Sequence, residues 1–192
     1  MQNPAFTGHA LKCESTTPGD GYSPYRGERV FVSAGSNVGD RQDNLIKALL
    51  ALGTRGVVVR KVSSFFETEP VGFREQPWFL NLALEVESHL SAPGLLAVCQ
   101  ELEVLRGRIR AFPGAPRTLD LDILFYGDRV IRVDGLLIPH PRLAERRFVL
   151  VPLAQIAPDF IHPLLGVTVS RLLETCTDKA IVRPFTPGDV PR

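Results

Sequence analysis

Residues 79–88, "FLNLALEVES", place a leucine or valine at every second position. Successive side chains of a β-strand point to opposite faces of its sheet, so this spacing predicts a strand with one strongly apolar face. The apolar face carries Leu80, Leu82, Leu84 and Val86, and the other face carries Phe79, Asn81, Ala83, Glu85 and Glu87. We therefore expect helices to cover the leucine face.

Periods of two and of about 3.6 residues alternate on both sides of this strand. Further strands are predicted over 29–35, about 57–68 and about 118–126. Between them lie two helices, one that ends at Gly53 and one that Ser91 can cap. Their apolar stripes are Leu45, Ala48, Leu49 and Leu52 in the first helix and Leu95, Val98, Cys99, Leu102 and Leu105 in the second. The order β-α-β-β-α-β is typical of a ferredoxin-like α+β sandwich, with both helices on one face of an antiparallel sheet.

The chain is interpreted as one domain over residues 28–175 with a segment at each end. Residues 1–27 are rich in Gly, Pro, Ser and Thr without sustained periodicity, which predicts a disordered arm. Residues 176–192 are interpreted as a C-terminal tail, and the proline-rich end from about 178 is expected to be disordered too. A hairpin over about 129–138 and a short apolar helix within 146–158 are expected to roof part of the sheet face opposite the helices.

The composition argues against several classes of protein. With 192 residues, 44% hydrophobic content and a net charge of +1, the chain fits one globular domain without bulk attraction to nucleic acid or membranes. Cys13, Cys99 and Cys176 form no CxxC pair, which argues against a disulfide framework or a zinc site. No apolar run approaches the roughly 18 residues of a membrane span, and no signal-peptide pattern opens the sequence. We expect a cytoplasmic protein and a monomer.

The stretch "RTLDLDIL" (117–124) places two carboxylates on one strand face. Asp120 and Asp122 are two residues apart, so their side chains point the same way at a spacing of roughly 6–7 Å. Like charges at that distance repel each other unless a cation lies between them. Two aspartates suit Mg²⁺, which keeps other positions for water and substrate phosphate. The alternative is a solvated strand face, as we assume for Glu85 and Glu87.

The segment just upstream, "RGRIRAFPGAPR" (106–117), contains four arginines and no acid. Its prolines and glycine predict a loop. Guanidinium groups hold phosphate oxygens in a bidentate fashion, so an arginine loop that leads into a metal-binding aspartate pair indicates phosphoryl transfer. The alternative is a solvated helix end that complements the helix dipole, which suits Arg106 better than Arg117. The sequence has no P-loop motif, and "GSNVGD" (35–40) is interpreted as a structural turn rather than a phosphate cradle.

Two further sets of side chains could contact a substrate. His140, in "IPHPRLAERRF" (138–148), is either a donor to phosphate or a structural turn histidine. Phe79, Asn81 and Phe148 could hold a flat heterocycle, because aromatic rings stack on it and an amide hydrogen-bonds to its edge. The alternative for the two phenylalanines is an ordinary place in the core.

Five motifs over about residues 29–165 form a specific set. They are "AGSNVGDR" (34–41), "FFETEPVG" (65–72), "QPWFLNLA" (76–83), "PRTLDLDILFYG" (116–127) and "IPHPRLAERRFVLVPLAQIAP" (138–158). Together they resemble the motifs of the 6-hydroxymethyl-7,8-dihydropterin pyrophosphokinases. The resemblance implies a ferredoxin-like fold and the transfer of a pyrophosphoryl group from ATP to a pterin alcohol in folate biosynthesis, with AMP released.

The resemblance also implies roles for individual residues. Asp120 and Asp122 would hold two Mg²⁺ ions, and Asp122 is also a candidate proton acceptor. Arg108 and Arg117 would act on the phosphates as catalytic residues. The implied nucleotide contacts are Arg108, Arg110, Arg117, Ile123, His140 and Arg146, and the implied pterin contacts are Thr68, Pro70, Val71, Gly72, Phe79, Asn81 and Phe148.

The chain departs from the family pattern in its arginine loop. Family members often have a tryptophan there and a glycine before the Pro-Arg pair, where this chain has Phe112 and Ala115. The packing of the closed loop is therefore open at this point.

Two rival functions need no such reaction. One is a non-catalytic ferredoxin-like module that binds a nucleotide or single-stranded RNA on its open sheet face. The acids on that face would repel a phosphate backbone. The other is a small-molecule regulatory domain, which needs no metal pair.

Overall fold

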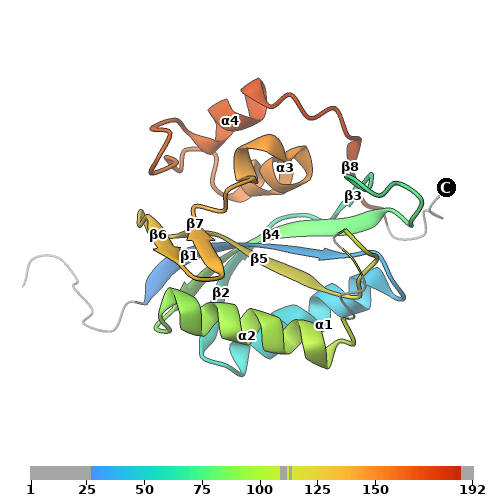
Figure 1. Cartoon of the computed structure of the whole chain (residues 1–192), viewed down its shortest axis with the longest axis horizontal. Helices are drawn as coiled ribbons and strands as arrows, with labels where there is room; N and C mark the ends of the chain where they lie inside the picture. Colours follow the sequence, from blue (N-terminus) through green and yellow to red (C-terminus); the bar gives the residue numbers. More distant parts are fainter. Residues whose placement is uncertain (1–26, 109–111, 113, 187–192) are drawn as a thin grey trace, which may run out of the picture.

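The computed structural model of this chain describes residues 27–108, 112 and 114–186 (Figure 1). A 3-10 helix (Leu143–Glu145) lies just before α3. The strands and helices, in chain order, are β1 (Glu28–Ser36), α1 (Arg41–Gly53), β2 (Val57–Val62), β3 (Phe66–Thr68), β4 (Phe79–Ser88), α2 (Ala92–Leu105), β5 (Asp120–Tyr126), β6 (Ile131–Val133), β7 (Leu136–Ile138), α3 (Arg147–Ile156), α4 (Val169–Thr175) and β8 (Val182–Pro184).

The main sheet is antiparallel throughout, in the order β5-β1-β4-β3-β8, and β2 also pairs with β4. β2 and β3 share one edge of β4, where β2 pairs with residues 84–88 and β3 with residues 79–81. Between them the side chain of Ser63 joins the backbone pairing, because its Oγ accepts the N–H of Ala83 at 2.9 Å. The ladder is interrupted there, so the single strand predicted over 57–68 is two strands.

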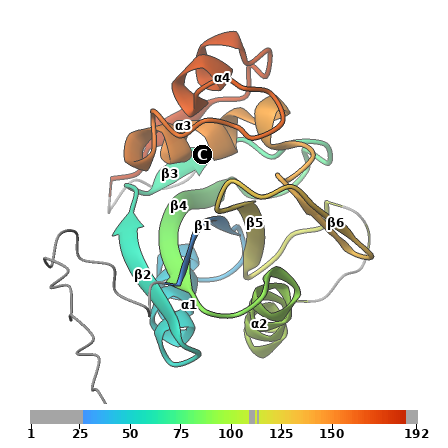
Figure 2. The same cartoon turned by 90° about the vertical axis from the view of Figure 1, so that its left-hand side faces the viewer.

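Helices α1 and α2 lie on the same side of the sheet (Figure 2). Asp40 caps α1 by accepting the N–H of Asp43, and Ser91 caps α2 by accepting the N–H of Gly94. The prediction that helices take the leucine face is confirmed, but Leu105 is 64% exposed and does not belong to the buried stripe. The core between sheet and helices includes Val30, Val32, Ala34, Leu80, Leu82, Leu84, Val86, Leu121 and Ile123 from the strands and Leu45, Ala48, Leu52, Leu95, Cys99 and Leu102 from the helices.

Helices α3 and α4 cover part of the opposite sheet face. A register shift in the pairing of β1 with β5 lets the consecutive residues Leu124 and Phe125 both pack into this second layer. The predicted hairpin is β6–β7, and the predicted roof helix is α3. The second core includes Phe31, Ala83, Leu124 and Phe125 from the sheet and Leu143, Val149, Leu150, Leu153, Val169 and Leu172 from the cover. Toward residues 79–81 and 120–122 this cover gives way to a cavity.

The C-terminal segment contains a strand that the sequence did not predict. Residues 1–26 of the predicted arm lie outside the described residues, as do residues 187–192. The segment from about 178 was expected to lack regular structure, which is wrong for residues 182–184, because they form β8 and pair with β3. Within the described part of the chain, no helix is long and apolar enough to cross a bilayer.

Candidate active site

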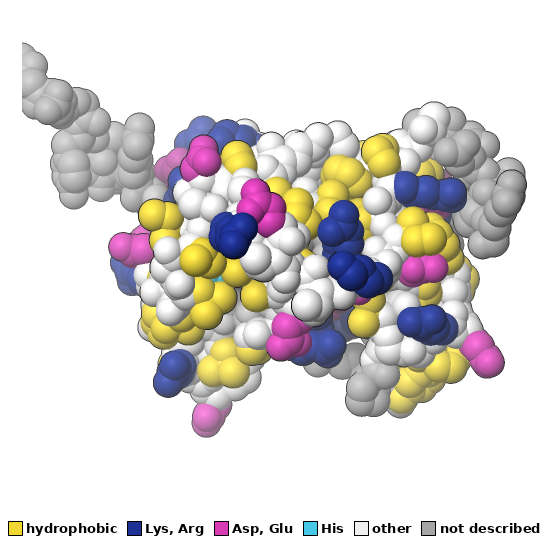
Figure 3. Space-filling model, turned by 90° about the horizontal axis from the view of Figure 1, so that it is seen from above, with side chains coloured by type: hydrophobic (Ala, Val, Ile, Leu, Met, Phe, Trp, Pro, Cys, Tyr) yellow, Lys and Arg dark blue, Asp and Glu magenta, His cyan; other side chains and the backbone are white. Residues whose placement is uncertain are grey.

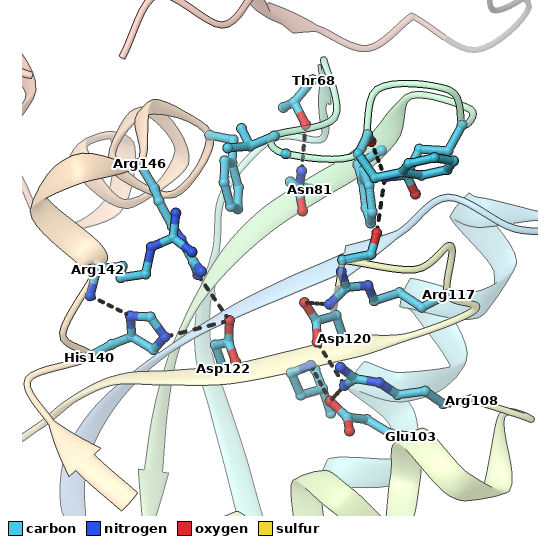
Figure 4. Close-up of a pocket in the computed structure, with 18 of the residues that line it drawn as sticks. Thr68, Asn81, Glu103, Arg108, Arg117, Asp120, Asp122, His140, Arg142 and Arg146 are labelled. Carbon is cyan, nitrogen blue, oxygen red and sulfur yellow. Dashed lines mark hydrogen bonds and ion pairs between the residues drawn. The ribbon is translucent and has the colours of Figure 1, made fainter. Parts of the chain in front are cut away.

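A cavity of about 600 Å³ opens on the sheet face that α3 and α4 leave uncovered (Figure 4). Its wall comes from α2, from β3, β4 and β5, from the loops before β4 and β5, from the turn between β6 and β7, and from the segment between β7 and the start of α3. The predicted site residues that line it are Thr68, Val71, Gly72, Phe79, Asn81, Arg108, Arg117, Asp120, Asp122, His140, Arg146 and Phe148. The structure thus brings the predicted metal, phosphate and heterocycle residues into one cavity.

Strand register places the two halves of this cavity side by side. Gly35 of β1 pairs with Asn81 of β4 on one side and with Asp120 of β5 on the other. A side chain at Gly35 would bring its Cβ to 2.4 Å from Asn81 Oδ1, so only glycine fits this close approach. Asn81 donates from Nδ2 to Thr68 Oγ1 at 2.7 Å, which fixes the orientation of the buried amide.

Asp120 is neutralised by two arginines of the upstream loop. Its Oδ1 lies 2.7 Å from Arg108 Nη1, and its Oδ2 accepts from Arg117 Nη1 at 2.9 Å. Arg108 also pairs with Glu103, a buried acid of α2 whose Oε1 accepts the N–H of Leu121 at 2.9 Å. In this structure, arginines therefore compensate the first of the two neighbouring carboxylates.

Asp122 has looser partners. Its Oδ2 lies 3.6 Å from Arg146 Nη1 and 3.9 Å from His140 Nε2, both beyond hydrogen-bonding distance. Burial and the neighbouring charge of Asp120 raise the pKa of Asp122 to about 6. An acid with a pKa raised by burial and by a like charge, in a cavity wall, is typical of a functional site.

His140 is held in one protonation state. Burial, helped by the charge of Arg146, lowers the pKa of His140 to about 4, so the ring is neutral at neutral pH. Its Nδ1 accepts the N–H of Arg142 at 3.2 Å. The ring proton is therefore on Nε2, which faces Asp122 and the cavity, and His140 is available as a donor.

The aspartate pair fits a hard divalent cation. Both carboxylates face the cavity, and a cation between them would relieve the repulsion that raises the pKa of Asp122. Oxygen ligands of this kind suit Mg²⁺ rather than Zn²⁺. Among the residues that the structure describes, no cluster of three or more His, Cys, Asp or Glu side chains could hold a metal by itself. A metal here would draw its other ligands from water or a substrate.

Two of the aromatic residues that line the cavity, Phe79 and Phe148, each lie against a guanidinium group. Arg117 Cζ is 5.6 Å from the ring centre of Phe79, and Arg146 Cζ is 5.6 Å from the ring centre of Phe148. Since Arg117 also contacts Asp120, and Arg146 lies near Asp122, the aromatic walls and the aspartates share the same cations. The residues predicted to hold a heterocycle and those predicted to hold phosphate are therefore adjacent.

Sequence reasoning did not identify the residues that join the loops around the cavity. Asn37 is buried; its Nδ2 donates to Gln76 Oε1 at 2.9 Å and to Pro77 O at 3.0 Å, and its Oδ1 accepts the N–H of Arg117 at 2.7 Å. Gln76 in turn donates to Gly114 O at 3.1 Å. These contacts support the interpretation of "GSNVGD" as a structural turn. The signal was present, because Asn37 and Gln76 both belong to quoted motifs.

Two predicted contacts, Pro70 and Ile123, are not among the residues that line the cavity. Ile123 packs in the core under the sheet, because it is one residue from Asp122 and points to the opposite face. Its side chain therefore does not reach the cavity, and a contact between Ile123 and the nucleotide stays a prediction. Pro70 is buried. Arg110 lies outside the described residues.

The open question about the arginine loop has a partial answer. Phe112 packs edge to face on Phe73, with ring centres 5.5 Å apart and an interplanar angle of 83°. Phe73 belongs to the loop before β4, which also carries Gln76. Phe112 of the arginine loop therefore contacts the loop before β4.

Comparisons with known proteins bear on this site. The model of the family described as 7,8-dihydro-6-hydroxymethylpterin-pyrophosphokinase (HPPK) matches residues 31–158. A 2-amino-4-hydroxy-6-hydroxymethyldihydropteridine pyrophosphokinase of Synechocystis is 40% identical over 166 residues, which cover 86% of this chain and 84% of that protein. The protein of the same name from Bacillus subtilis is 45% identical over 66% of this chain and 76% of its own length.

Longer proteins match as well. The folic acid synthesis protein fol1 of Pneumocystis carinii is 38% identical over 83% of this chain, which spans only 22% of that protein. A solved structure titled as HPPK-DHPS in complex with substrates shares the fold, with a TM-score of 0.63 at 12% identity over 78% of this chain and 43% of the other. The family match covers the strands, loops and helix start that build the cavity. The chain belongs to the 7,8-dihydro-6-hydroxymethylpterin-pyrophosphokinase family.

Proposed function

We propose that this chain transfers a pyrophosphoryl group from ATP to 6-hydroxymethyl-7,8-dihydropterin in folate biosynthesis, giving the pterin diphosphate and AMP. One observation carries the proposal: a single cavity combines an aspartate pair, a set of arginines, a buried amide and two aromatic rings. Each set suits one part of the reaction, namely metal, phosphate and pterin. Family membership and the names of the relatives support the same reaction.

The pterin would occupy the end of the cavity formed by β3, β4 and α3. Phe79 and Phe148 offer aromatic faces, and Asn81 offers its fixed amide to the edge of the ring. The backbone of Val71 and Gly72 lies at the same end. A planar ring with polar edges needs these two kinds of contact, one for its faces and one for its edge.

The triphosphate would occupy the end formed by β5 and the arginine loop. Asp120 and Asp122 would hold two Mg²⁺ ions, which would neutralise phosphate charge and so help the β-phosphorus accept a nucleophile. Arg108 and Arg117, which now contact Asp120, can donate to phosphate oxygens from the same positions. His140 adds a neutral N–H donor, and Arg146 adds a further positive charge.

The chemical step is an in-line attack of the pterin hydroxymethyl oxygen on the β-phosphorus, with AMP as the leaving group. The attacking hydroxyl loses a proton, for which Asp122 is our candidate acceptor. The loop contacts made by Gln76 and Phe112 help to close the cavity against water that would otherwise hydrolyse ATP.

We assign the sheet and helix layer to the ferredoxin-like class. The antiparallel order β5-β1-β4-β2, with α1 and α2 on one face, supports this assignment. Strands β3 and β8 extend the edge of that core beyond β4. The absence of a nucleic-acid partner and the monomeric state stay predictions.

The rival RNA-binding function is less favoured. On the molecular face that Figure 3 shows, basic and acidic side chains are interspersed among apolar ones, whereas a phosphate backbone needs a continuous basic surface. The aspartates in the cavity would also repel such a backbone.

A direct assay separates the proposals. The protein is mixed with ATP, Mg²⁺ and the pterin alcohol, and the products are resolved by chromatography. We expect AMP and pterin diphosphate in equal amounts, and no AMP when the pterin is omitted. ADP in place of AMP, or release of inorganic phosphate alone, would contradict pyrophosphoryl transfer.

A further inference from the structure

Glu67 is a buried acid on the far side of the strand that carries Thr68. Its side chain is 1% exposed and faces α1, because Thr68 on the next position faces the cavity. Two arginines hold it. Arg41 of α1 lies 2.8 Å from Glu67 Oε1, and Arg183 of β8 donates to Oε2 from Nη2 at 2.6 Å and from Nε at 3.2 Å.

The buried carboxylate of Glu67 is held in its ionised form. Burial alone would raise the pKa of Glu67, but hydrogen bonds from Arg183 and Arg41 outweigh it and hold that pKa below its usual range. A buried carboxylate with two charged donors has a fixed geometry, and removing either donor leaves its charge partly uncompensated. The position of β3 therefore depends on both arginines.

The same two arginines reach the residue next to Phe79. Arg41 donates from Nη1 to Trp78 O at 2.9 Å, and the guanidinium of Arg183 lies 5.1 Å from the ring centre of Trp78. Trp78 directly precedes Phe79, which pairs with Thr68 across the ladder. The cluster thus holds, from behind, both strands that present the pterin wall.

The C-terminal segment makes further contacts to the cavity wall. Ile181 exchanges two hydrogen bonds with Glu69, a residue that lines the cavity: its O accepts from Glu69 N at 3.1 Å, and its N donates to Glu69 Oε2 at 2.8 Å. On the other side, Asp178 Oδ2 accepts the N–H of Arg147 at 3.0 Å, directly before Phe148. In Figure 1 this segment runs from α4 past α3 to β8.

We propose that residues 178–185 form a strap that positions the pterin subsite, with Arg183 as its main positioning residue. The strap contacts the backbone or neighbours of both aromatic walls, on β3–β4 and at the start of α3. It lies outside residues 31–158, which the family model matches. Arg183 acts through Glu67 and Trp78 and does not touch the substrate. This inference rests on the proposed pterin function of the cavity.

The kinetic test compares Arg183→Ala and Arg183→Lys with Arg171→Ala. Arg171 is a matched control, because it also pairs with a glutamate, Glu174, but on exposed α4. Loss of a charge-assisted contact should raise the KM for the pterin roughly tenfold in Arg183→Ala, with the KM for ATP changed less than about twofold. Arg183→Lys keeps the charge and should recover part of the loss. Equal rises in both KM values, or wild-type values, would overturn the strap.

A second measurement needs no turnover. Hydrogen exchange of the backbone amides of residues 66–69 and 79–81 should be faster in Arg183→Ala than in wild type, and unchanged in Arg171→Ala. Unchanged exchange in Arg183→Ala would overturn the inference. If wild-type protein makes no AMP, the proposed function fails, and the exchange result alone then decides whether the strap holds this wall.

Discussion

Glu67 and Asp122 are two acids on the same sheet with opposite surroundings. Glu67 is 1% exposed, yet two arginines within 2.8 Å hold its pKa below the usual range for a glutamate. The guanidinium of Arg146 lies 3.6 Å from Asp122 and the neutral ring of His140 lies 3.9 Å away, and burial with the charge of Asp120 raises the pKa of Asp122 to about 6. An arginine lies near each acid, so the presence of a nearby arginine does not by itself distinguish them.

The two acids differ in the distance to their charged partners and in the direction of their pKa shifts. Direct charge-assisted hydrogen bonds offset the desolvation of Glu67, so its ionised form belongs to the folded structure. The surroundings of Asp122 disfavour its ionised form. A bound cation would stabilise that negative charge, as expected of an acid in a functional site. We therefore interpret Glu67 as a structural acid and Asp122 as a functional one.

The largest expected effect is on catalysis at the aspartate pair. Asp122→Asn or Asp120→Asn should lower turnover roughly 1,000-fold, because each carboxylate would help to hold a metal worth several kcal/mol of charge stabilisation. The measurement is AMP formation at saturating ATP and pterin. Turnover within tenfold of wild type in both variants would place these acids with Glu67, as structural groups.

The arginines on Asp120 should affect turnover more than binding. Arg108→Ala or Arg117→Ala should lower turnover roughly 100-fold and nucleotide affinity only a few-fold, since the charge on the transferring group develops in the transition state. Steady-state kinetics and a nucleotide titration give the two numbers. Arg106→Ala is the control, because Arg106 belongs to the same segment and does not line the cavity. A loss of affinity as large as the loss of turnover would instead indicate ground-state binding.

Removal of the structural acid should act on stability. Glu67→Ala leaves Arg41 and Arg183 without their shared carboxylate and should lower the free energy of unfolding by about 2 kcal/mol, because a broken buried pair strands its partners. Urea unfolding measures this. Glu174→Ala removes an exposed pair and should change stability little. If the two variants were equally stable, the Glu67 cluster would be no more than a surface ion pair.

The alternation of side chains between the two faces of a strand accounts for what could be predicted from the sequence. Alternation in 79–88 and 117–124 placed Phe79, Asn81, Asp120 and Asp122 on one face, as the structure shows. The same alternation, had it been applied to Ile123, would have excluded its side chain from the cavity. The assignment of Ile123 to the nucleotide came from the family resemblance, and it stays a prediction.

Long-range contacts account for what was missed. Glu103 enters the cavity wall from α2, where a helical stripe gives no reason to expect a buried acid. Strand β8 has three residues and forms on the edge that β3 provides, so its local sequence carries little signal. Asn37 and Gln76 lie 39 positions apart, and only the folded chain brings them within hydrogen-bonding distance.

The smallest expected effect is on stability, and it tests whether the pKa of Asp122 is raised while that of Glu67 is lowered. Since the pKa of Asp122 is raised from 3.8 to about 6, the folded chain binds more protons than the unfolded chain between these values, and stability falls as the pH rises through them. Asp122→Asn removes this penalty. At pH 7 without Mg²⁺ it should therefore be more stable than wild type by about 1 kcal/mol, a discounted figure because the carboxylate is 36% exposed and screened. Thermal unfolding should show a melting temperature roughly 2–4 °C higher.

The advantage should vanish near pH 4, and Mg²⁺ should raise the melting temperature of wild type more than that of the variant. A variant less stable than wild type at pH 7 would mean that Asp122, like Glu67, is held by its partners.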